Sequence, residues 1–191
     1  MSNLKKIGVI GTGWIFQNEH VLGYLETDSG YIACFHDVSE EAIKDAMNLY
    51  ISGMKKRLKK AKTPEEKLLC QKALECKYYN DVNELLDVVD GVDICTPPQY
   101  HTYYAKMAAD KDKAVLCEKP LARTYPDAEE ALKSLKDVPF YIFTQVIYNP
   151  IFKKGKELID TGVIGEIKKM RCCHATLDLS HTWKKKRFGI L

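Results

Sequence analysis

The stretch that decides the fold is Lys5-Lys6-Ile7-Gly8-Val9-Ile10-Gly11-Thr12-Gly13-Trp14-Ile15. A short apolar run ends at two glycines spaced Gly-x-Gly, and residues 14–25 are predicted to form a helix. Such a strand–turn–helix presents unpaired backbone N–H groups and a positive dipole end, where a pyrophosphate can bind. The usual third glycine is missing, because Phe16 stands in its place. Taken alone, the Gly-x-Gly also fits a tight turn that uses glycine for steric reasons only.

Length and composition indicate a globular chain. Its 191 residues, 46% of them apolar, suffice for one full domain and part of another, and a net charge of +3 predicts neither a nucleic-acid nor a membrane partner. The seven cysteines lack paired C-x-x-C spacing, so we expect neither a metal site nor a disulfide framework. Reduced thiols, no signal-peptide core and no membrane-length apolar stretch favour a cytoplasmic location.

Short apolar strands alternate with helices along the chain. The predicted strands are 5–10, 31–37, 91–95, 114–117 and 140–144, and the predicted helices are 14–25, 40–50, 82–89, 99–110, 124–135 and 149–161. Strands that are apolar throughout are typical of a parallel sheet covered on both faces. We therefore predict an α/β fold, a Rossmann-type doubly wound parallel sheet, over residues 1–148. Residues 149–191 are expected to be the incomplete beginning of a second, α+β domain.

Residues 51–76 are interpreted as a helical insertion. Its first helix has apolar residues at helical spacing, and its second begins at Thr63-Pro64-Glu65-Glu66, which has the pattern of a capping box with proline at the first position. The apolar positions are Ile51, Met54, Leu58 and Ala61 in the first helix, and Leu68, Leu69, Ala73 and Leu74 in the second. The basic run at 55–62 is expected on the solvent side, where it is more often a solvated face than a nucleic-acid site.

Further residues strengthen the cofactor interpretation. Asp37 ends the second strand, where an acid can accept the ribose hydroxyls of an adenosine and repel a 2′-phosphate, so NAD is favoured over NADP. Thr96-Pro97-Pro98 follows another strand and should lie at the same carboxyl edge of the sheet, either facing the cofactor or simply starting a helix. His101 either points to this site or lies on a helix face, and the helix face is slightly favoured.

The combined motifs resemble the Gfo/Idh/MocA oxidoreductases. The resemblance rests on the glycine turn, on Thr96-Pro97-Pro98 with His101, and on Cys117-Glu118-Lys119-Pro120-Leu121-Ala122. Gln145 followed by Asn149-Pro150, and later Gly162-Val163-Ile164-Gly165-Glu166-Ile167, are similar to the family's junction into its second domain. The resemblance covers nearly the whole chain apart from 51–76 and the last residues.

The resemblance implies a pyridine-nucleotide dehydrogenase that transfers a hydride between nicotinamide and a hydroxyl carbon of a sugar, cyclitol or related alcohol. Lys119 would be catalytic, contacting the reacting hydroxyl and assisting proton transfer, and Pro120 would set the backbone that aims it. The expected cofactor-binding residues are Gly11, Thr12, Gly13, Trp14, Ile15, Asp37, Thr96, Pro97, Pro98, His101, Glu118, Lys119 and Gln145. Without the resemblance, Glu118 and Lys119 would be interpreted as an ordinary exposed pair.

Two departures from the family pattern limit these expectations. Many members carry arginines just after the position of Gln145, where this chain has Val146-Ile147. Members also continue into a larger open sheet with an Asp/His motif, which His174 and His181 do not match. We therefore expect the 191-residue chain to bind NAD weakly and to turn over little by itself. Residues 167–179 mix polar and apolar side chains as a half-exposed strand does, and the open edge of that strand would favour pairing with another chain, as in a homo-oligomer formed through the C-terminal sheet.

Two other functions stay open at this point. A non-catalytic nucleotide-binding or interaction module could keep the Rossmann fold and lose the chemistry. The two departures favour that alternative, and the intact Glu118-Lys119-Pro120 argues against it. A Rossmann-like methyltransferase is weaker, because the Glu-Lys-Pro element would then have no role.

Overall fold

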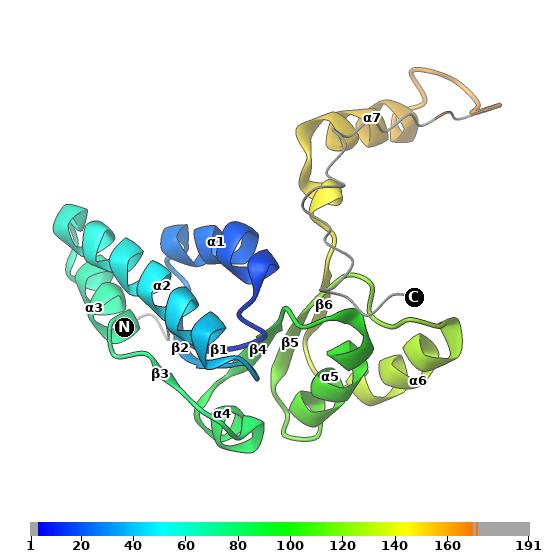
Figure 1. Cartoon of the computed structure of the whole chain (residues 1–191). Helices are drawn as coiled ribbons and strands as arrows, with labels where there is room; N and C mark the ends of the chain where they lie inside the picture. Colours follow the sequence, from blue (N-terminus) through cyan, green and yellow to red (C-terminus); the bar gives the residue numbers. More distant parts are fainter. Residues whose placement is uncertain (1–3, 170, 172–191) are drawn as a thin grey trace, which may run out of the picture. The chain divides into compact units, whose positions relative to one another are not determined.

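The structure is a computed structural model that describes residues 4–169 and Arg171 (Figure 1). The chain divides into two units, the first ending at Phe143 and the second beginning at Thr144. The domain boundary predicted after residue 148 stays a prediction.

The first unit is built on a six-stranded parallel sheet. Its strands are β1 (Lys5–Ile10), β2 (Gly30–His36), β3 (Lys77–Tyr78), β4 (Gly91–Ile94), β5 (Ala114–Glu118) and β6 (Phe140–Phe143). Their order across the sheet is β3-β2-β1-β4-β5-β6, and all neighbouring pairs are parallel. This confirms the predicted Rossmann-type doubly wound sheet; the two-residue β3 was not predicted. Its topological switch point lies at β1, where the order reverses and where such folds bind ligands.

Helices cover both faces of this sheet. One face carries α1 (Val21–Glu26), which continues a helical segment from Trp14, together with α2 (Glu40–Lys60) and α3 (Pro64–Ala73). The other face carries α4 (Val82–Val88), α5 (His101–Ala109) and α6 (Tyr125–Leu135). In Figure 1, α1 and α2 lie above the strands and α4 below them.

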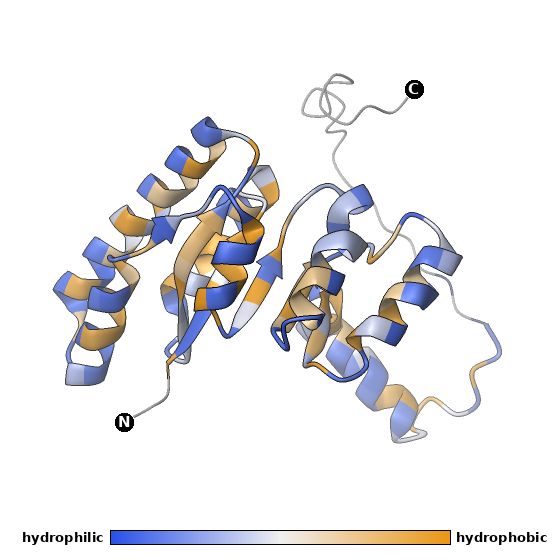
Figure 2. Cartoon of the chain, turned by 90° about the horizontal axis from the view of Figure 1, so that it is seen from below, coloured by the Kyte–Doolittle hydropathy of each residue, from blue (hydrophilic) through white to orange (hydrophobic). Residues whose placement is uncertain are grey.

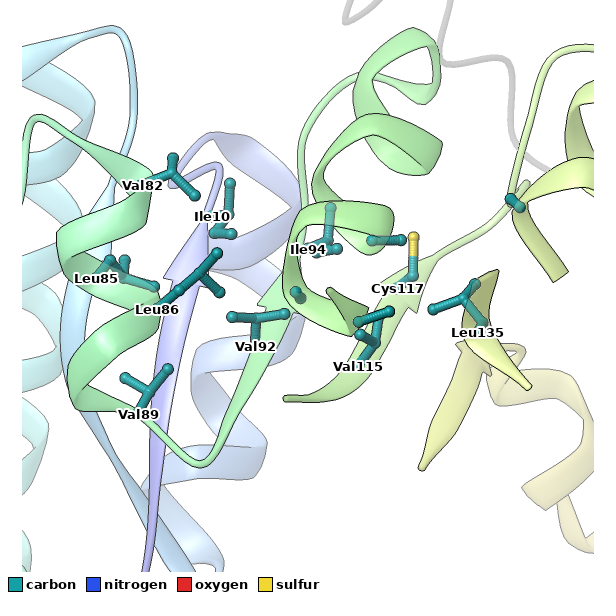
Figure 3. Close-up of a cluster of buried hydrophobic side chains, with 14 of the residues drawn as sticks. Ile10, Val82, Leu85, Leu86, Val89, Val92, Ile94, Val115, Cys117 and Leu135 are labelled. Carbon is teal, nitrogen blue, oxygen red and sulfur yellow. The ribbon is translucent and has the colours of Figure 1, made fainter. Parts of the chain in front are cut away.

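Two separate groups of buried side chains hold these layers together. Figure 3 shows Leu85 and Leu86 of α4 reaching towards Ile10 and Val92 on adjacent strands. The opposite face buries Phe35, whose ring contacts those of Phe16 and Tyr50 edge to face. Figure 2 shows the strands as mostly hydrophobic, while the helices carry both hydrophobic and hydrophilic residues. Burial of apolar side chains on both faces of the strands stabilises a parallel sheet that helices cover on two sides.

The helical insertion was predicted with one wrong boundary. Instead of a helix ending at Tyr50 and another starting at Ile51, α2 runs unbroken from Glu40 to Lys60. Tyr50 and Met54 are both fully buried on the same side, so the apolar stripe continues across the expected break. The second helix begins as predicted, with the Thr63 and Glu66 capping box formed.

The apolar side of α3 was predicted in part. Leu69 and Ala73 are buried, but Leu68 is exposed and Cys70 is buried instead. The side chains of the basic run 55–62 are mostly exposed, as expected. Arg57 is the exception, because it is partly buried, donates to the carbonyl oxygens of Leu25 and Thr27, and pairs with Asp28.

The second unit is described up to residue 169 and at Arg171. A 3₁₀ turn (Gln145–Tyr148) leads to α7 (Pro150–Asp160), whose N-cap is Asn149. Gly162 follows α7 with φ +70, the left-handed conformation of the predicted glycine cap. Residues 167–169 and 171 form no strand, and the rest of the strand predicted at 167–179 lies outside the described residues. In the described part of the chain, no helix has the length and apolarity to span a membrane.

Candidate functional site

Four predicted site segments lie at one edge of the sheet. The glycine turn follows β1, Asp37 follows β2, Thr96 lies just beyond β4, and Glu118 is the last residue of β5. These strands are neighbours and parallel, so their carboxyl ends meet at the same edge. Backbone bonds tie the ends together: Gly11 N–H donates to the His36 oxygen at 2.9 Å, and Cys95 N–H to the Ile10 oxygen at 2.8 Å.

The two glycines of the turn serve different purposes. Gly11 has φ +90, and a Cβ there would lie 2.6 Å from the Thr96 nitrogen, so the fold itself requires glycine. A Cβ at Gly13 would meet nothing within 4 Å, and its φ is not positive. Nothing in the described chain therefore demands glycine at position 13. The open space is where a ligand could approach the backbone closely.

The helix that follows the turn has an unusual first part. Residues Phe16–His20 form a π-helical turn between Trp14 and α1. Phe16, which replaces the third glycine, is fully buried, with its ring 5.9 Å from that of Phe35. Trp14 is 63% exposed and Ile15 packs partly buried against the core. Such π-helical turns are frequent at functional sites. Here the helix begins after the Gly-x-Gly turn even though Phe16 replaces the usual third glycine.

Asp37 is tied to the glycine turn. Its Oδ2 accepts hydrogen bonds from the Thr12 backbone N–H at 2.6 Å and from the Thr12 hydroxyl at 3.2 Å. Its Oδ1 accepts one from the Ser39 N–H at 3.0 Å. The carboxylate is half-buried, so it both shapes the turn and presents negative charge at this edge. Its contact with a ribose stays a prediction.

His101 links two loops of the site. It is buried at the start of α5, with Nδ1 2.7 Å from the Pro120 oxygen and Nε2 2.7 Å from the Thr96 oxygen. Carbonyl oxygens only accept, so a neutral ring satisfies one of them and a doubly protonated ring satisfies both. His101 therefore positions the Thr96 loop against the Glu118-Lys119-Pro120 loop. A direct cofactor contact stays a prediction for this residue.

The Thr96 loop has one unsatisfied polar group. The Thr96 Oγ1 atom is buried and has no hydrogen-bond partner among the described residues. Pro97 precedes a 3₁₀ turn (Pro98–Tyr100) that leads into α5, which matches the interpretation in which the prolines start a helix. Their predicted contact with a cofactor is untested.

Glu118 and Lys119 are not the ordinary exposed pair that composition alone suggested. Glu118 is 4% exposed, whereas Lys119 is exposed and, within the described residues, its ammonium has no ion-pair partner. The Lys119 backbone N–H donates to Glu118 Oε2 at 3.0 Å, and the Lys119–Pro120 peptide is cis. A free ammonium thus lies at the carboxyl edge on a backbone held by a buried acid.

Sequence reasoning missed His20, which lies in the π-helical turn. His20 is 5% exposed, with Nδ1 2.9 Å from Asp93 Oδ2 and Nε2 3.0 Å from Glu118 Oε1. Its ring also lies 4.3 Å from that of Phe143. A charged residue, Asp93, inside the apolar strand Gly91–Ile94 was the available signal, because a buried acid needs a partner.

These contacts shift several pKa values. Burial lowers the pKa of His20, but hydrogen bonds and charge from Asp93 and Glu118 outweigh it and raise the pKa to about 9. Burial alone would raise the pKa of Glu118. The His20 contact and the hydrogen bond from the Lys119 N–H outweigh burial, so the pKa of Glu118 lies below its ordinary value. Burial and Asp93 raise the pKa of both Tyr24 and Cys95. The array is therefore an imidazolium between two carboxylates.

The same cluster offers atoms that can bind metals. Ligand atoms of His20, Asp93 and Cys95 lie within 4.8 Å of one another, although no metal was expected from the sequence. Cys95 Sγ donates to Asp93 Oδ1 at 3.5 Å and lies 3.4 Å from His20 Nδ1. Both imidazole nitrogens face carboxylates, which is the arrangement of a doubly protonated ring with no lone pair for a metal.

Gln145 belongs to the second unit, in the 3₁₀ turn Gln145–Tyr148. Its predicted hydrogen bond to the nicotinamide amide stays a prediction, as does the consequence of Val146-Ile147 in place of arginines.

Comparison with known proteins decides the family. Residues 5–140 match the family model described as the Gfo/Idh/MocA oxidoreductase family, NAD-binding Rossmann fold. The chain belongs to the Gfo/Idh/MocA family. The match covers β1 to β5, the first residue of β6, and every segment of the site except Gln145.

Curated relatives of this Gfo/Idh/MocA chain include sugar and cyclitol dehydrogenases. Myo-inositol 2-dehydrogenase of Thermotoga maritima is 32% identical over 142 residues, which cover 72% of this chain and 40% of the relative. D-xylose 1-dehydrogenase [NADP(+)] of Haloarcula marismortui is 39% identical over 82 residues, covering 42% of this chain and 23% of the relative. The chain thus spans less than half the length of these relatives.

Solved structures show the same fold. Myo-inositol dehydrogenase from Lactobacillus casei, in complex with NAD(H) and myo-inositol, has a TM-score of 0.67 at 24% identity, covering 85% of this chain and 43% of that one. An oxidoreductase from Agrobacterium radiobacter in complex with NAD+ has a TM-score of 0.68 at 22% identity, covering 85% of this chain and 42% of that one. At these identities the likeness establishes the fold alone.

Proposed function

We propose that this chain forms the cofactor-binding part of an NAD-dependent dehydrogenase that acts on a hydroxyl carbon of a sugar, cyclitol or related alcohol. The observation that carries the proposal is the meeting of four segments at one sheet edge: the glycine turn, Asp37, the Thr96 loop and Lys119. A tight turn alone needs none of the other three. Together they supply a phosphate cradle, an acid for a ribose and a cation for a reacting hydroxyl.

The residues present fit a dinucleotide. A side chain at Gly13 would occupy open space at the start of a helix, where the N–H groups of residues such as Trp14 and Ile15 favour a pyrophosphate. At the same sheet edge, the buried Thr96 hydroxyl lacks a partner among the described residues, and leaving such a group unsatisfied costs about 1–3 kcal/mol. A ligand or a local rearrangement on binding would satisfy it.

The charge at Asp37 supports NAD over NADP. Its carboxylate is held towards the turn by Thr12 and Ser39, so it cannot easily swing away from a 2′-phosphate. At about 4 Å, two like charges near a protein surface repel by about 4 kcal/mol. The relative from Haloarcula marismortui carries NADP(+) in its name, so nucleotide choice varies among relatives and depends on local residues.

Lys119 is proposed as the catalytic residue. Bound nicotinamide would accept or supply the hydride, and the chain's own task is to manage the proton of the substrate hydroxyl. The Lys119 ammonium is exposed at the edge where the substrate would meet the cofactor, and an adjacent positive charge stabilises a developing alkoxide. The same group can pass the proton on. The names of the relatives support cyclitols and sugars as the substrate class.

Replacement of Lys119 tests this function. In a full-length version that includes the substrate domain, Lys119→Met should lower NADH formation from a panel of cyclitols and sugars at least about a hundredfold, the usual range for a general acid–base group, with NAD affinity unchanged. Lys59→Met on the exposed end of α2 is the matched control and should keep full turnover. Turnover that survives in Lys119→Met contradicts the assigned role. No NADH from any of these substrates, with NAD still bound, contradicts the dehydrogenase and leaves the nucleotide site standing.

A further inference from the structure

The array around His20 connects two strands, the π-helical turn and the loop that carries Lys119. Asp93 lies on β4, His20 in the π-helical turn, and Glu118 at the end of β5. His20 hydrogen-bonds Asp93 through Nδ1 and Glu118 through Nε2, and the Lys119 N–H donates to the other oxygen of Glu118, so the bonds connect without a gap. Each link is 2.9–3.0 Å long. The chain of bonds ends at the backbone of the residue proposed to transfer the proton.

Burial restricts the protonation state of the array. Asp93 is fully buried and Glu118 nearly so, and a carboxylate in that position needs compensation. Two carboxylates placed on one ring leave no acceptor role for either ring nitrogen, since ionised carboxylates only accept. Among the described residues, the Tyr24 hydroxyl and the Cys95 and Cys117 thiols also face Asp93, and burial with the Asp93 charge raises the pKa of all three, so they stay neutral. The Lys119 charge also lowers the pKa of Glu118, by less than His20 does.

We propose that His20 is a positioning residue: its ring, held between the Asp93 and Glu118 carboxylates, locks Glu118 and thereby fixes the backbone from which Lys119 reaches the substrate. The proposal rests on the proposed function for its consequence, because a fixed Lys119 backbone matters to the reaction only if Lys119 acts in it. The placement of His20 itself does not depend on that function. Glu118 is then held by two donors, on separate oxygens, and cannot rotate to pair with the Lys119 ammonium.

The raised pKa of His20 gives the array a measurable signature. With its pKa at about 9, the ring stays charged through neutral pH and loses its proton only in alkaline solution. Loss of that proton removes one donor, and the Glu118 carboxylate reorganises around the Lys119 N–H. The Lys119 amide should therefore report the titration of a ring that it does not touch.

The test is an NMR titration of the 191-residue chain. Imidazole ¹⁵N resonances of His20 should show two protonated nitrogens at pH 7, with a midpoint near pH 9, and the Lys119 amide resonance should move with the same midpoint. His20→Gln should abolish the pH-dependent shift of the Lys119 amide resonance. His36→Gln is the matched control, because His36 is also buried but bonds the Tyr79 carbonyl oxygen, and it should leave the Lys119 titration unchanged.

A second variant keeps the proposal testable if His20→Gln does not fold. Asp93→Asn should lower the titration midpoints of the His20 ring and of the Lys119 amide resonance together. The substitution removes the carboxylate charge beside His20 Nδ1 without touching Lys119. The proposal is refuted by a neutral His20 ring at pH 7, by a Lys119 amide that does not follow His20, or by a zinc-dependent signal that a chelator removes. NAD titration calorimetry on the same sample separates the two claims, because a coupled Lys119 without NAD binding refutes the proposed function alone.

Discussion

Single residues at the carboxyl edge differ in whether the fold or a ligand explains them. Gly11 is required by its φ of +90 and by the approach of the next strand, while Gly13 has open space. Asp37 and Glu118 each serve two roles, since both hold backbone N–H groups and also place charge at the edge. Positions that the chain's own packing does not explain are the ones that indicate a ligand.

Asp37 sets nucleotide choice in this account. Asp37→Asn keeps the shape of the side chain and removes its charge, so the NADP-to-NAD affinity ratio should rise about tenfold or more, a change of about 1.4 kcal/mol. Titration calorimetry with both nucleotides measures the ratio. Asp45→Asn, at an exposed position of α2, is the control and should leave it unaltered. An unchanged ratio in Asp37→Asn would mean that Asp37 is not at the ribose.

His20 makes the stability of the fold depend on pH. Its pKa is raised from 6.5 to about 9, so the charged ring stabilises the folded state fully below pH 6.5, and the stabilisation is lost as pH rises through about 9. A pKa shift of this size corresponds to about 3 kcal/mol of the free energy of unfolding. Urea unfolding across that window should show the decline, and His20→Gln should flatten it. Buried thiols act in the same direction only near and above their ordinary pKa of 9.0, so an equal slope in both proteins below about pH 8 would refute the assignment.

Elements were predictable where local chemistry decides them. Apolar strands and the caps at Ser39, Thr63 and Thr124 follow from residue type, and the structure has all three caps. The continuity of α2 was missed although the spacing carried it, because Ala46, Tyr50 and Met54 follow helical spacing across the expected break. The two-residue β3 and the π-helical turn depend on tertiary contacts that no local pattern encodes.

The capping box of α3 gives a prediction at this scale. Thr63→Ala removes the acceptor for the Glu66 N–H, held at 3.2 Å, and should reduce the free energy of unfolding by about 1 kcal/mol. α3 contacts α2 and β2 rather than the site, so NAD affinity should not change. Chemical denaturation and calorimetry on one preparation measure both. A loss of NAD affinity in Thr63→Ala would show that α3 is coupled to the site.

At the scale of the whole molecule, the sequence predicted the doubly wound parallel sheet and the edge that carries the motifs. Fold and family followed from three motifs in the right order, and the family match covers residues 5–140. The His20 array could not be predicted in the same way, because its members are 73 and 98 positions apart in sequence and meet only through the crossover of β1 and β4. Side chains that meet across strands need the register that the fold supplies.

The most direct test of the account is the NAD affinity of Gly13→Ala relative to the unaltered chain, measured by titration calorimetry. The added methyl group meets no atom of the described chain within 4 Å, so the fold should be retained while NAD binding weakens about tenfold or more. Gly23→Ala is the control, because Gly23 also has open space but lies within α1, and its NAD affinity should be unchanged. An NAD affinity in Gly13→Ala equal to that of the unaltered chain, or no NAD binding by either, would contradict a nucleotide site at this edge.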